Sequence, residues 1–319
     1  DIVGGSYNKN AKDRCDVNKI ANPDGVDVDS KGNVWIAEDT SNHQNNVLWM
    51  WDGKRLKRFA TVPKKAEITG LHITANDEIF FNVQHPSAMS KYPYNRGVVG
   101  IVTGFKATDS FREIPVPKGD KMLDVVVAAG KYQVLSRVGE PIPNDIYGHR
   151  YGQINNVDGT LKLICNQPDG NMFLPIDEAG TFGYLYSNYE CRPGGVVKNY
   201  IQKIGDEWKV LSGENVDFSG VKGTWVNCNA STTPWNTGLT SEEYEPVASR
   251  SGWKKNVKNM TEYLGTQANP YDYGYPVELI PDPKGKTAKT IVVKHYSMGR
   301  MSYEMSRVMP DLKTVYSGD

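Results

Sequence analysis

The stretch Val26-Asp27-Val28-Asp29-Ser30-Lys31-Gly32-Asn33-Val34-Trp35-Ile36-Ala37 sets the pattern for the whole chain. Apolar and polar side chains alternate at its start, and a Ser-Lys-Gly-Asn turn leads into a second, apolar run. Alternation with a period of two residues indicates a strand with one buried face, and Gly and Asn favour the backbone of a tight turn. The stretch therefore predicts two antiparallel strands joined by a short turn.

The same strand-turn-strand pattern recurs along the chain. Residues 47–51 and 58–62 flank Asp52-Gly53-Lys54, a hairpin signal, and residues 68–73 and 79–83 flank another polar turn. Further strands are predicted over residues 124–127, 132–136, 161–165, 184–187, 196–204, 208–211, 276–279 and 290–295. Because helical periodicity is scarce, the pattern predicts an all-β sandwich, barrel or propeller.

The length of the chain favours the propeller. A four-stranded blade takes about 40–50 residues, so 319 residues hold about six or seven blades. We predict a single β-propeller domain over residues 1–319 with long loops on its top face. One such loop is predicted over residues 230–273, with a short helix near residues 251–263, and residues 305–308 are predicted to form a short helical turn.

Composition limits the partners of the chain. Lys and Arg together number 37, as do Asp and Glu, so nucleic acid and anionic membrane surfaces are not favoured. Mean hydropathy is −0.53 and no apolar run approaches the roughly 18 residues of a membrane span, so no membrane insertion is expected. The N-terminus has no signal-like apolar segment, which indicates a soluble, processed or truncated chain. The 18 Tyr and 31 Gly favour a secreted or periplasmic β protein.

The four cysteines are Cys15, Cys165, Cys191 and Cys228. None of them forms a CxxC pair, which argues against a zinc ribbon or a thioredoxin-like site and leaves two disulfides possible. Cys228 follows Trp225-Val226-Asn227 and precedes a Pro-Trp loop. A buried or disulfide-bonded cysteine and a metal-ligating thiolate are both compatible with this setting.

Carboxylates recur at predicted strand ends and loop starts. Asp24 lies in a Pro-Asp-Gly turn, and Glu67 precedes Thr69-Gly70 in an apolar setting where a carboxylate needs a partner or a cation. The other carboxylates of this kind are Glu190, Glu243 and Glu304. His85 ends an apolar strand, where it contacts a ligand or caps the loop. If a circular fold brings them together with Cys228, these groups supply the hard and soft ligands of a mixed metal site.

Standard catalytic motifs are absent from the sequence. The five histidines show no HxH or HExxH spacing, which disfavours a zinc hydrolase, and no GxSxG, Walker or GxGxxG motif occurs.

Several of these segments together resemble the PhoX family of secreted alkaline phosphatases. The resembling segments are residues 22–25, 67–70, 81–86, 124–141, 223–228, 233–237, 241–243, 298–304 and 314–319. Their order is permuted relative to the family: residues 1–106 resemble its C-terminal blades, and residues 107–319 its N-terminal blades. A propeller closes on itself, so permutation is compatible with that fold.

The resemblance implies a six-bladed propeller whose central site holds iron and calcium and hydrolyses phosphate monoesters. It also implies that Cys228 is similar to the iron-binding cysteine of the family. The carboxylate ligands that it implies are Asp24, Glu67, Glu304, Glu190 and Glu243.

The substrates implied by the resemblance are small-molecule phosphate esters. In such a site the metals neutralise the phosphate and the leaving alkoxide, and Arg300, Lys222 and His85 are candidates for further contacts with the substrate. Two alternatives stay open. One is a calcium-dependent lactonase-type propeller, which needs a hard cation and no thiolate, and the other is a non-catalytic secreted propeller used for binding or extracellular assembly.

Overall fold

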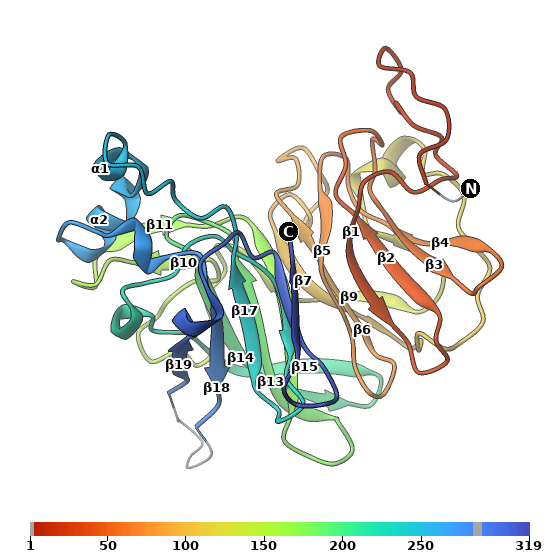
Figure 1. Cartoon of the computed structure of the whole chain (residues 1–319). Coiled ribbons are helices and arrows are strands. Elements are labelled where there is room, and N and C mark those ends of the chain that lie inside the picture. The colour runs from red at the N-terminus through yellow and green to blue at the C-terminus, as the bar shows by residue number, and fades with distance from the viewer. Residues whose placement is uncertain (1–2, 283–288) are drawn as a thin grey trace. The chain divides into compact units, whose positions relative to one another are not determined.

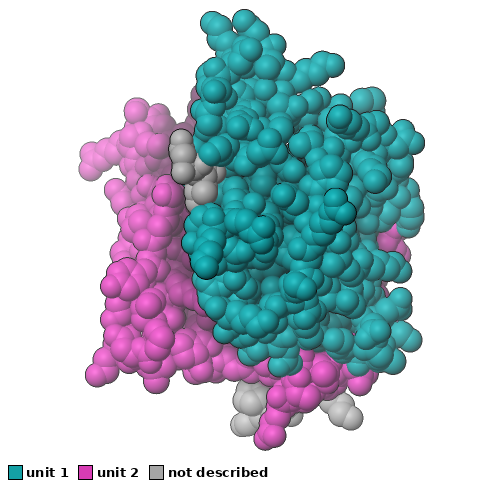
Figure 2. All heavy atoms as spheres, turned by 90° about the vertical axis from the view of Figure 1, so that its right-hand side faces the viewer, with its two compact units in different colours: residues 1–138, 203–209 teal, residues 139–202, 210–319 magenta. Residues whose placement is uncertain are grey.

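The computed structural model describes residues 3–282 and 289–319. Short antiparallel strands dominate it, and the few helices are short, so the all-β class is confirmed (Figure 1). The chain divides into two compact units, residues 1–138 with 203–209 and residues 139–202 with 210–319, which Figure 2 distinguishes by colour. No helix in the described ranges is both long and apolar enough to cross a membrane.

Unit 1 contains two sheets. The first has the order β1 (Pro23–Val28), β2 (Val34–Glu38), β3 (Val47–Trp51), β4 (Leu56–Thr61) and β8 (Val126–Val127). The second has the order β5 (Glu67–Ile73), β6 (Ile79–Gln84), β7 (Val98–Thr103) and β9 (Lys131–Arg137). The three predicted hairpins β1–β2, β3–β4 and β5–β6 are confirmed.

The core of unit 1 is aromatic. The Trp35 and Phe59 rings are fully buried, with centroids 4.9 Å apart in an edge-to-face contact, and Phe105 stacks on Phe59 at 4.9 Å. Such pairs contribute about 0.5–1.5 kcal/mol beyond the burial of their apolar area. A 3-10 turn, η1 (Gly119–Leu123), precedes β8.

Unit 2 contains two four-stranded sheets and two strand pairs. The sheets are β12 (Pro168–Pro175), β13 (Phe182–Tyr189), β14 (Gly195–Ile204) and β15 (Glu207–Asn215), then β16 (Asn227–Thr232), β17 (Gly238–Glu242), β18 (Pro276–Ile280) and β19 (Ile291–Lys294). The pairs are β10 (Gln153–Asn155) with β11 (Leu161–Ile164), and β20 (Met305–Val308) with β21 (Val315–Gly318). The short helices are α1 (Trp253–Asn256), α2 (Lys258–Leu264), η2 (Ser219–Val221), η3 (Pro270–Asp272) and η4 (Tyr296–Met298).

Two local predictions are wrong. Residues 305–308 form strand β20 rather than a helical turn, because they pair with β21 across a turn in which Asp311 Oδ1 accepts the N–H groups of Lys313 and Thr314. Residues 230–273 are not one loop, since β17 lies among them and its side chains are buried. The helix predicted near residues 251–263 is confirmed as α1 and α2.

The cysteines separate into two classes. Cys165 and Cys191 form a disulfide, while Cys15 and Cys228 are free thiols. Of the two disulfides that the sequence allows, one is therefore present, and Cys228 keeps the thiol that metal ligation needs.

Candidate metal centre

Strands β1, β12 and β16 are each the first strand of a sheet, and in each of them the pairing register with the next strand breaks close to the start of the strand. In β1 the break includes Asp24, in β12 it includes Asp169, and in β16 it includes Cys228. A β-bulge of this kind inserts an extra residue, re-aims a side chain and is common beside active sites. The three sheets thus present Asp24, Asp169 and Cys228 from equivalent positions.

The second strand of each pair ends beside this bulge and is followed by a carboxylate. These carboxylates belong to Asp39 after β2, Glu190 after β13 and Glu243 after β17. The backbone N–H of each of these residues donates to the carbonyl of the residue just before the first strand. The distances are 3.3 Å from Asp39 N to Asn22 O, 2.9 Å from Glu190 N to Gln167 O and 3.0 Å from Glu243 N to Val226 O. The same hydrogen bond therefore sets one bulge residue and one carboxylate side by side in each sheet.

In unit 2 these positions gather around Cys228. Burial raises the pKa of the Cys228 thiol well above its usual value, and the nearby carboxylates raise it further. Those carboxylates belong to Asp169, Glu243, Glu190 and Glu304. The structure therefore brings together four of the predicted site residues (Cys228, Glu190, Glu243 and Glu304) and adds Asp169.

Glu243 is an acid of this cluster with a raised pKa. Burial and the charge of Glu190 raise its pKa to about 7, although hydrogen bonds from Tyr244 and Cys228 act in the opposite direction. Asp319, which follows β21, adds another negative charge. Carboxylates crowded in this way repel one another unless protons or cations compensate their charge.

The chemical character of these donors fits a mixed metal site. Carboxylate oxygens suit calcium and a thiolate suits a softer metal such as iron. In the parts of the chain described here, no group of three or more His, Cys, Asp or Glu side chains is arranged to hold a metal ion. The types of donor fit such a site, and the raised pKa of Glu243 is that of a carboxyl group that holds its proton more tightly than usual.

Unit 1 holds a second titratable cluster. His85 Nε2 lies 2.6 Å from Glu67 Oε1, and Asp39 shares a hydrogen bond with the same carboxylate. Burial, together with Asp39, raises the pKa of Glu67, while the hydrogen bond to Glu67 raises the pKa of His85. Asp24 belongs to β1, which lies against β5, the strand that begins at Glu67. In this unit Glu67 thus shares hydrogen bonds with a histidine and a second acid.

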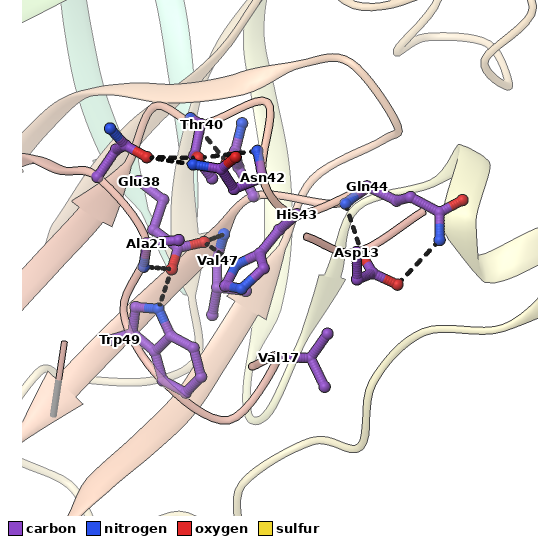
Figure 3. A network of polar contacts seen from close by, with 12 residues as sticks. Asp13, Val17, Ala21, Glu38, Thr40, Asn42, His43, Gln44, Val47 and Trp49 are labelled. Carbon is purple, nitrogen blue, oxygen red and sulfur yellow. Dashed lines mark hydrogen bonds and ion pairs between the residues drawn. The ribbon is translucent and has the colours of Figure 1, made fainter. Parts of the chain in front are cut away.

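The carboxylates just before Asp39 and Glu243 have a structural role. Glu38 is fully buried, and it accepts hydrogen bonds from Ala21 N at 3.0 Å, Val47 N at 3.0 Å and Trp49 Nε1 at 2.7 Å, as Figure 3 shows. His43 Nδ1 is the fourth partner, at 3.1 Å.

Glu242 repeats this arrangement at the end of β17. It accepts backbone N–H groups of Trp225, Gly274 and Tyr275 and pairs with Lys294 Nζ at 2.9 Å. Both Glu242 and Lys294 are buried. These acids hold loops in place and are not available to a ligand.

Lys222 and Arg300, predicted as substrate contacts, both engage the segment around η3. Lys222 Nζ lies 2.9 Å from Asp272 Oδ2. Arg300 Nε donates to Tyr273 O at 2.8 Å, a second guanidinium nitrogen donates to the Pro246 carbonyl, and the guanidinium lies over the Tyr271 ring. These contacts give both cations a structural role, and their contact with a substrate stays a prediction.

Val226 adds backbone strain next to Cys228. It is buried and has a φ of +45°, which is rare for a β-branched residue because Cβ crowds the backbone. The Val226 N–H donates to Cys191 O at 2.9 Å, and the Val226 carbonyl accepts the Glu243 N–H. Hydrogen bonds therefore hold the backbone on both sides of the Val226 Cα atom. Strain of this kind costs about 1–3 kcal/mol and clusters at functional sites.

Asp169 was missed in the sequence, although a signal existed. Pro168-Asp169-Gly170 repeats the letters of Pro23-Asp24-Gly25, and both triplets open a first strand. The repeat could have identified the second aspartate.

Comparisons with known proteins identify the family of the chain. The family model of alkaline phosphatase PhoX matches residues 2–87 and 205–319, which include Asp24, Glu67, Cys228, Glu243 and Glu304. No curated protein matches the chain. Among solved structures, a putative oxidoreductase (glucose dehydrogenase) from Thermus thermophilus is 14% identical with a TM-score of 0.37, over 99% of this chain and 92% of that one. The family model matches well over half of the residues of this chain, and the chain therefore belongs to the PhoX alkaline phosphatase family.

Proposed function

We propose that the chain is a metal-dependent phosphomonoesterase and that the cluster around Cys228 is part of its reaction centre. The observation that carries the proposal is a free, half-buried thiol close to the carboxylates of Asp169, Glu190, Glu243 and Glu304. Membership of the PhoX family supports small-molecule phosphate esters as the substrates.

The proposed cofactors are iron and calcium. Cys228 would hold iron together with neighbouring carboxylates, because a thiolate is a soft, strongly donating ligand. The remaining carboxylates, including Asp24 and Glu67, would hold calcium, which prefers oxygen. When bound, these metals would neutralise phosphate oxygens and stabilise the leaving alkoxide.

The residues of the chain itself prepare this chemistry. Cys228 and Glu243 must lose their protons before they bind a cation, so loading releases protons to solvent. Tyr244 donates a hydrogen bond to Glu243 and fixes that carboxylate. In unit 1, Glu67 orients His85, whose side chain is 43% exposed and whose raised pKa favours the imidazolium form, a donor for a phosphate oxygen.

We propose further that the sheets are blades of a six-bladed propeller spanning residues 1–319. In that ring, residues 107–319 would form the first blades of the family's order, and residues 1–106 would form the blades that close the ring. The proposed location is secreted or periplasmic, which the Cys165–Cys191 disulfide supports because disulfides persist in oxidising compartments. A lactonase-type site would need no thiolate and a binding propeller would need no acidic cluster, so neither alternative accounts for Cys228 and its neighbours.

Replacement of Cys228 tests the proposal. In Cys228→Ser we expect iron to be lost and turnover of p-nitrophenyl phosphate to fall by at least about 10–100-fold, the range seen when even outer-shell metal partners are removed. Calcium content and far-UV circular dichroism should stay at the wild-type level. Metal analysis by mass spectrometry and steady-state kinetics provide the measurements.

Cys15→Ser is the matched control, since Cys15 is the other free thiol and lies in unit 1. It should keep both iron and turnover. Wild-type turnover in Cys228→Ser would make Cys228 a structural residue. A metal-loaded wild type that hydrolyses lactones and no phosphate ester would overturn the phosphatase proposal itself.

A further inference from the structure

Tyr244 places an exposed aromatic ring at the edge of the Cys228 cluster. The residue follows Glu243 directly, and its hydroxyl donates a hydrogen bond to the Glu243 carboxylate. The negative charge of Glu243 and this hydrogen bond raise the pKa of the Tyr244 hydroxyl, so the phenol keeps its proton and stays a donor. The phenol is thus tied to a candidate metal ligand, although Tyr244 is 58% exposed to solvent.

Backbone contacts hold Tyr244 in this place. Its φ is +49°, which is rare for a bulky residue because Cβ crowds the backbone. The Tyr244 N–H donates to Ser302 Oγ at 2.9 Å, and the Tyr244 carbonyl accepts Trp225 Nε1 at 2.8 Å. Trp225 and Ser302 precede Cys228 and Glu304 by only a few residues. Two segments of the centre therefore fix a strained residue, and such residues cluster at ligand sites.

The exposed ring has no partner within the protein. Elsewhere in unit 2, exposed tyrosine rings pack against other groups: Arg300 lies 5.6 Å from the Tyr271 ring, and Tyr275 lies 4.8 Å from Tyr296. In residues 3–282 and 289–319, neither an aromatic ring nor a cation packs on Tyr244 in this way. A rigidly held ring beside the centre thus keeps a surface that a bound molecule would cover.

We propose that the Tyr244 ring contacts the leaving group of the ester and makes the centre selective for phosphate monoesters of aromatic alcohols. This inference rests on the proposed function, in which the phosphate is held at the Cys228 cluster. Two aromatic rings attract each other beyond the burial of their apolar area, whereas an aliphatic group gains from burial alone. Tyr244 would therefore determine specificity, in addition to its hydrogen bond to Glu243.

Two inert analogues of matched shape test the preference. Benzylphosphonate and cyclohexylmethylphosphonate both join a six-membered ring to a phosphonate through one CH₂ group, and they differ in aromaticity. Isothermal titration calorimetry on the purified, metal-loaded full chain should show the benzyl compound binding about two- to tenfold more tightly. Burial alone would not give this order, since the cyclohexyl ring is at least as apolar. Equal Kd values, or binding of neither analogue, would overturn the inference.

Turnover of benzyl phosphate is measured separately and reports on the proposed function. If the wild type binds the benzyl analogue more tightly but hydrolyses no phosphate ester, the phosphatase proposal fails while the aromatic preference stands. If the wild type hydrolyses benzyl phosphate but binds both analogues equally, the phosphatase proposal stands and the role of Tyr244 fails.

Variants then assign the preference to Tyr244. In Tyr244→Leu the ratio of the two Kd values should fall close to one, whereas Tyr244→Phe should keep it, because phenylalanine retains the ring and loses only the hydroxyl. Tyr316→Leu is the control, since Tyr316 is 68% exposed and lies opposite Arg307 in the β20–β21 pair. It should keep the wild-type ratio. A loss of metal or stability would weaken both analogues alike, so the ratio reports on the ring. An unchanged ratio in Tyr244→Leu, or an equal loss in Tyr316→Leu, would make the inference wrong.

Discussion

Two adjacent carboxylates act differently at the end of a strand. Successive side chains of a strand point to opposite sides, so in Glu38-Asp39 and in Glu242-Glu243 the two acids meet different surroundings. The first acid of each pair accepts several buried N–H groups, and the second belongs to a cluster of titratable side chains. An acidic pair in the sequence is therefore one structural group and one candidate ligand.

Glu38→Gln should destabilise unit 1 strongly. The amide has only one acceptor oxygen, and its NH₂ group takes the place of the other carboxylate oxygen. The N–H groups that donate to that oxygen in the wild type would lose their acceptor, and each buried donor left unpaired costs about 1–3 kcal/mol. We expect urea unfolding to show a loss of that size or larger. Glu207→Gln should change the unfolding free energy by less than about 0.5 kcal/mol, because Glu207 is exposed; it lies at the turn between β14 and β15, whose residues 203–209 belong to unit 1. Similar values for both variants would contradict the assigned role of Glu38.

At the scale of elements, strand pairs that flank a clear turn were predictable, and a strand that buries polar side chains was not. Alternation and turn residues were enough for β1–β2, β3–β4 and β5–β6. In contrast, β12 buries Asp169 and Asn171, and Asn171 Oδ1 is satisfied by Ser187 Oγ at 2.8 Å on β13. A partner on another strand is not visible in a sequence read locally, which is why β12 was missed.

The candidate site was only partly accessible for the same reason. Spacing in the sequence identified Cys228 and the carboxylates as residues that need partners, but their grouping came from the resemblance to the PhoX family. The register breaks at Asp24, Asp169 and Cys228 depend on pairing between strands, which no local pattern encodes. That Lys222 and Arg300 bind the segment around η3 likewise depends on tertiary contacts.

Close packing of first strands supplies a test at this scale. A Cβ atom on Gly170 of β12 would lie 2.5 Å from Ala230 N and 2.6 Å from Ala230 Cβ of β16. Gly170→Ala should therefore push these strands apart, with a loss of about 1–3 kcal/mol in unfolding free energy. Because Asp169 and Cys228 lie on the same two strands, phosphatase activity should fall as well.

Gly220→Ala is the control for this substitution, since a Cβ there meets nothing within 4 Å. It should keep both stability and activity. If Gly170→Ala behaved like Gly220→Ala, the distance between β12 and β16 would not matter for the centre.

At the scale of the whole molecule, a neutral chain concentrates negative charge locally. The formal charges cancel, yet the carboxylates of Asp169, Glu190, Glu243 and Glu304 all act on Cys228. Without a cation, the repulsion is relieved by protons at a cost in folding free energy. Bound metal would remove this cost, so stability and cofactor content should be linked.

Metal removal is therefore expected to lower the thermal unfolding temperature. A ligand that binds only the folded state adds about 2.7 kcal/mol when its free concentration is 100 times its Kd. Differential scanning calorimetry should thus show calcium-loaded wild type unfolding at a higher temperature than protein treated with a chelator. Because the chain divides into two compact units, more than one transition is expected, and each is compared separately.

Two variants make the result specific to the proposed ligands. Glu243→Gln should lose most of the difference between loaded and chelated protein, since it replaces a carboxylate of the Cys228 cluster by an amide that calcium binds more weakly. Glu207→Gln, which is exposed and belongs to unit 1 while the cluster residues belong to unit 2, should keep the full difference. Identical thermograms for loaded and chelated wild type would mean that protons alone compensate the cluster. Its raised pKa values would then be a property of packing, and the metal-dependent proposal would fail.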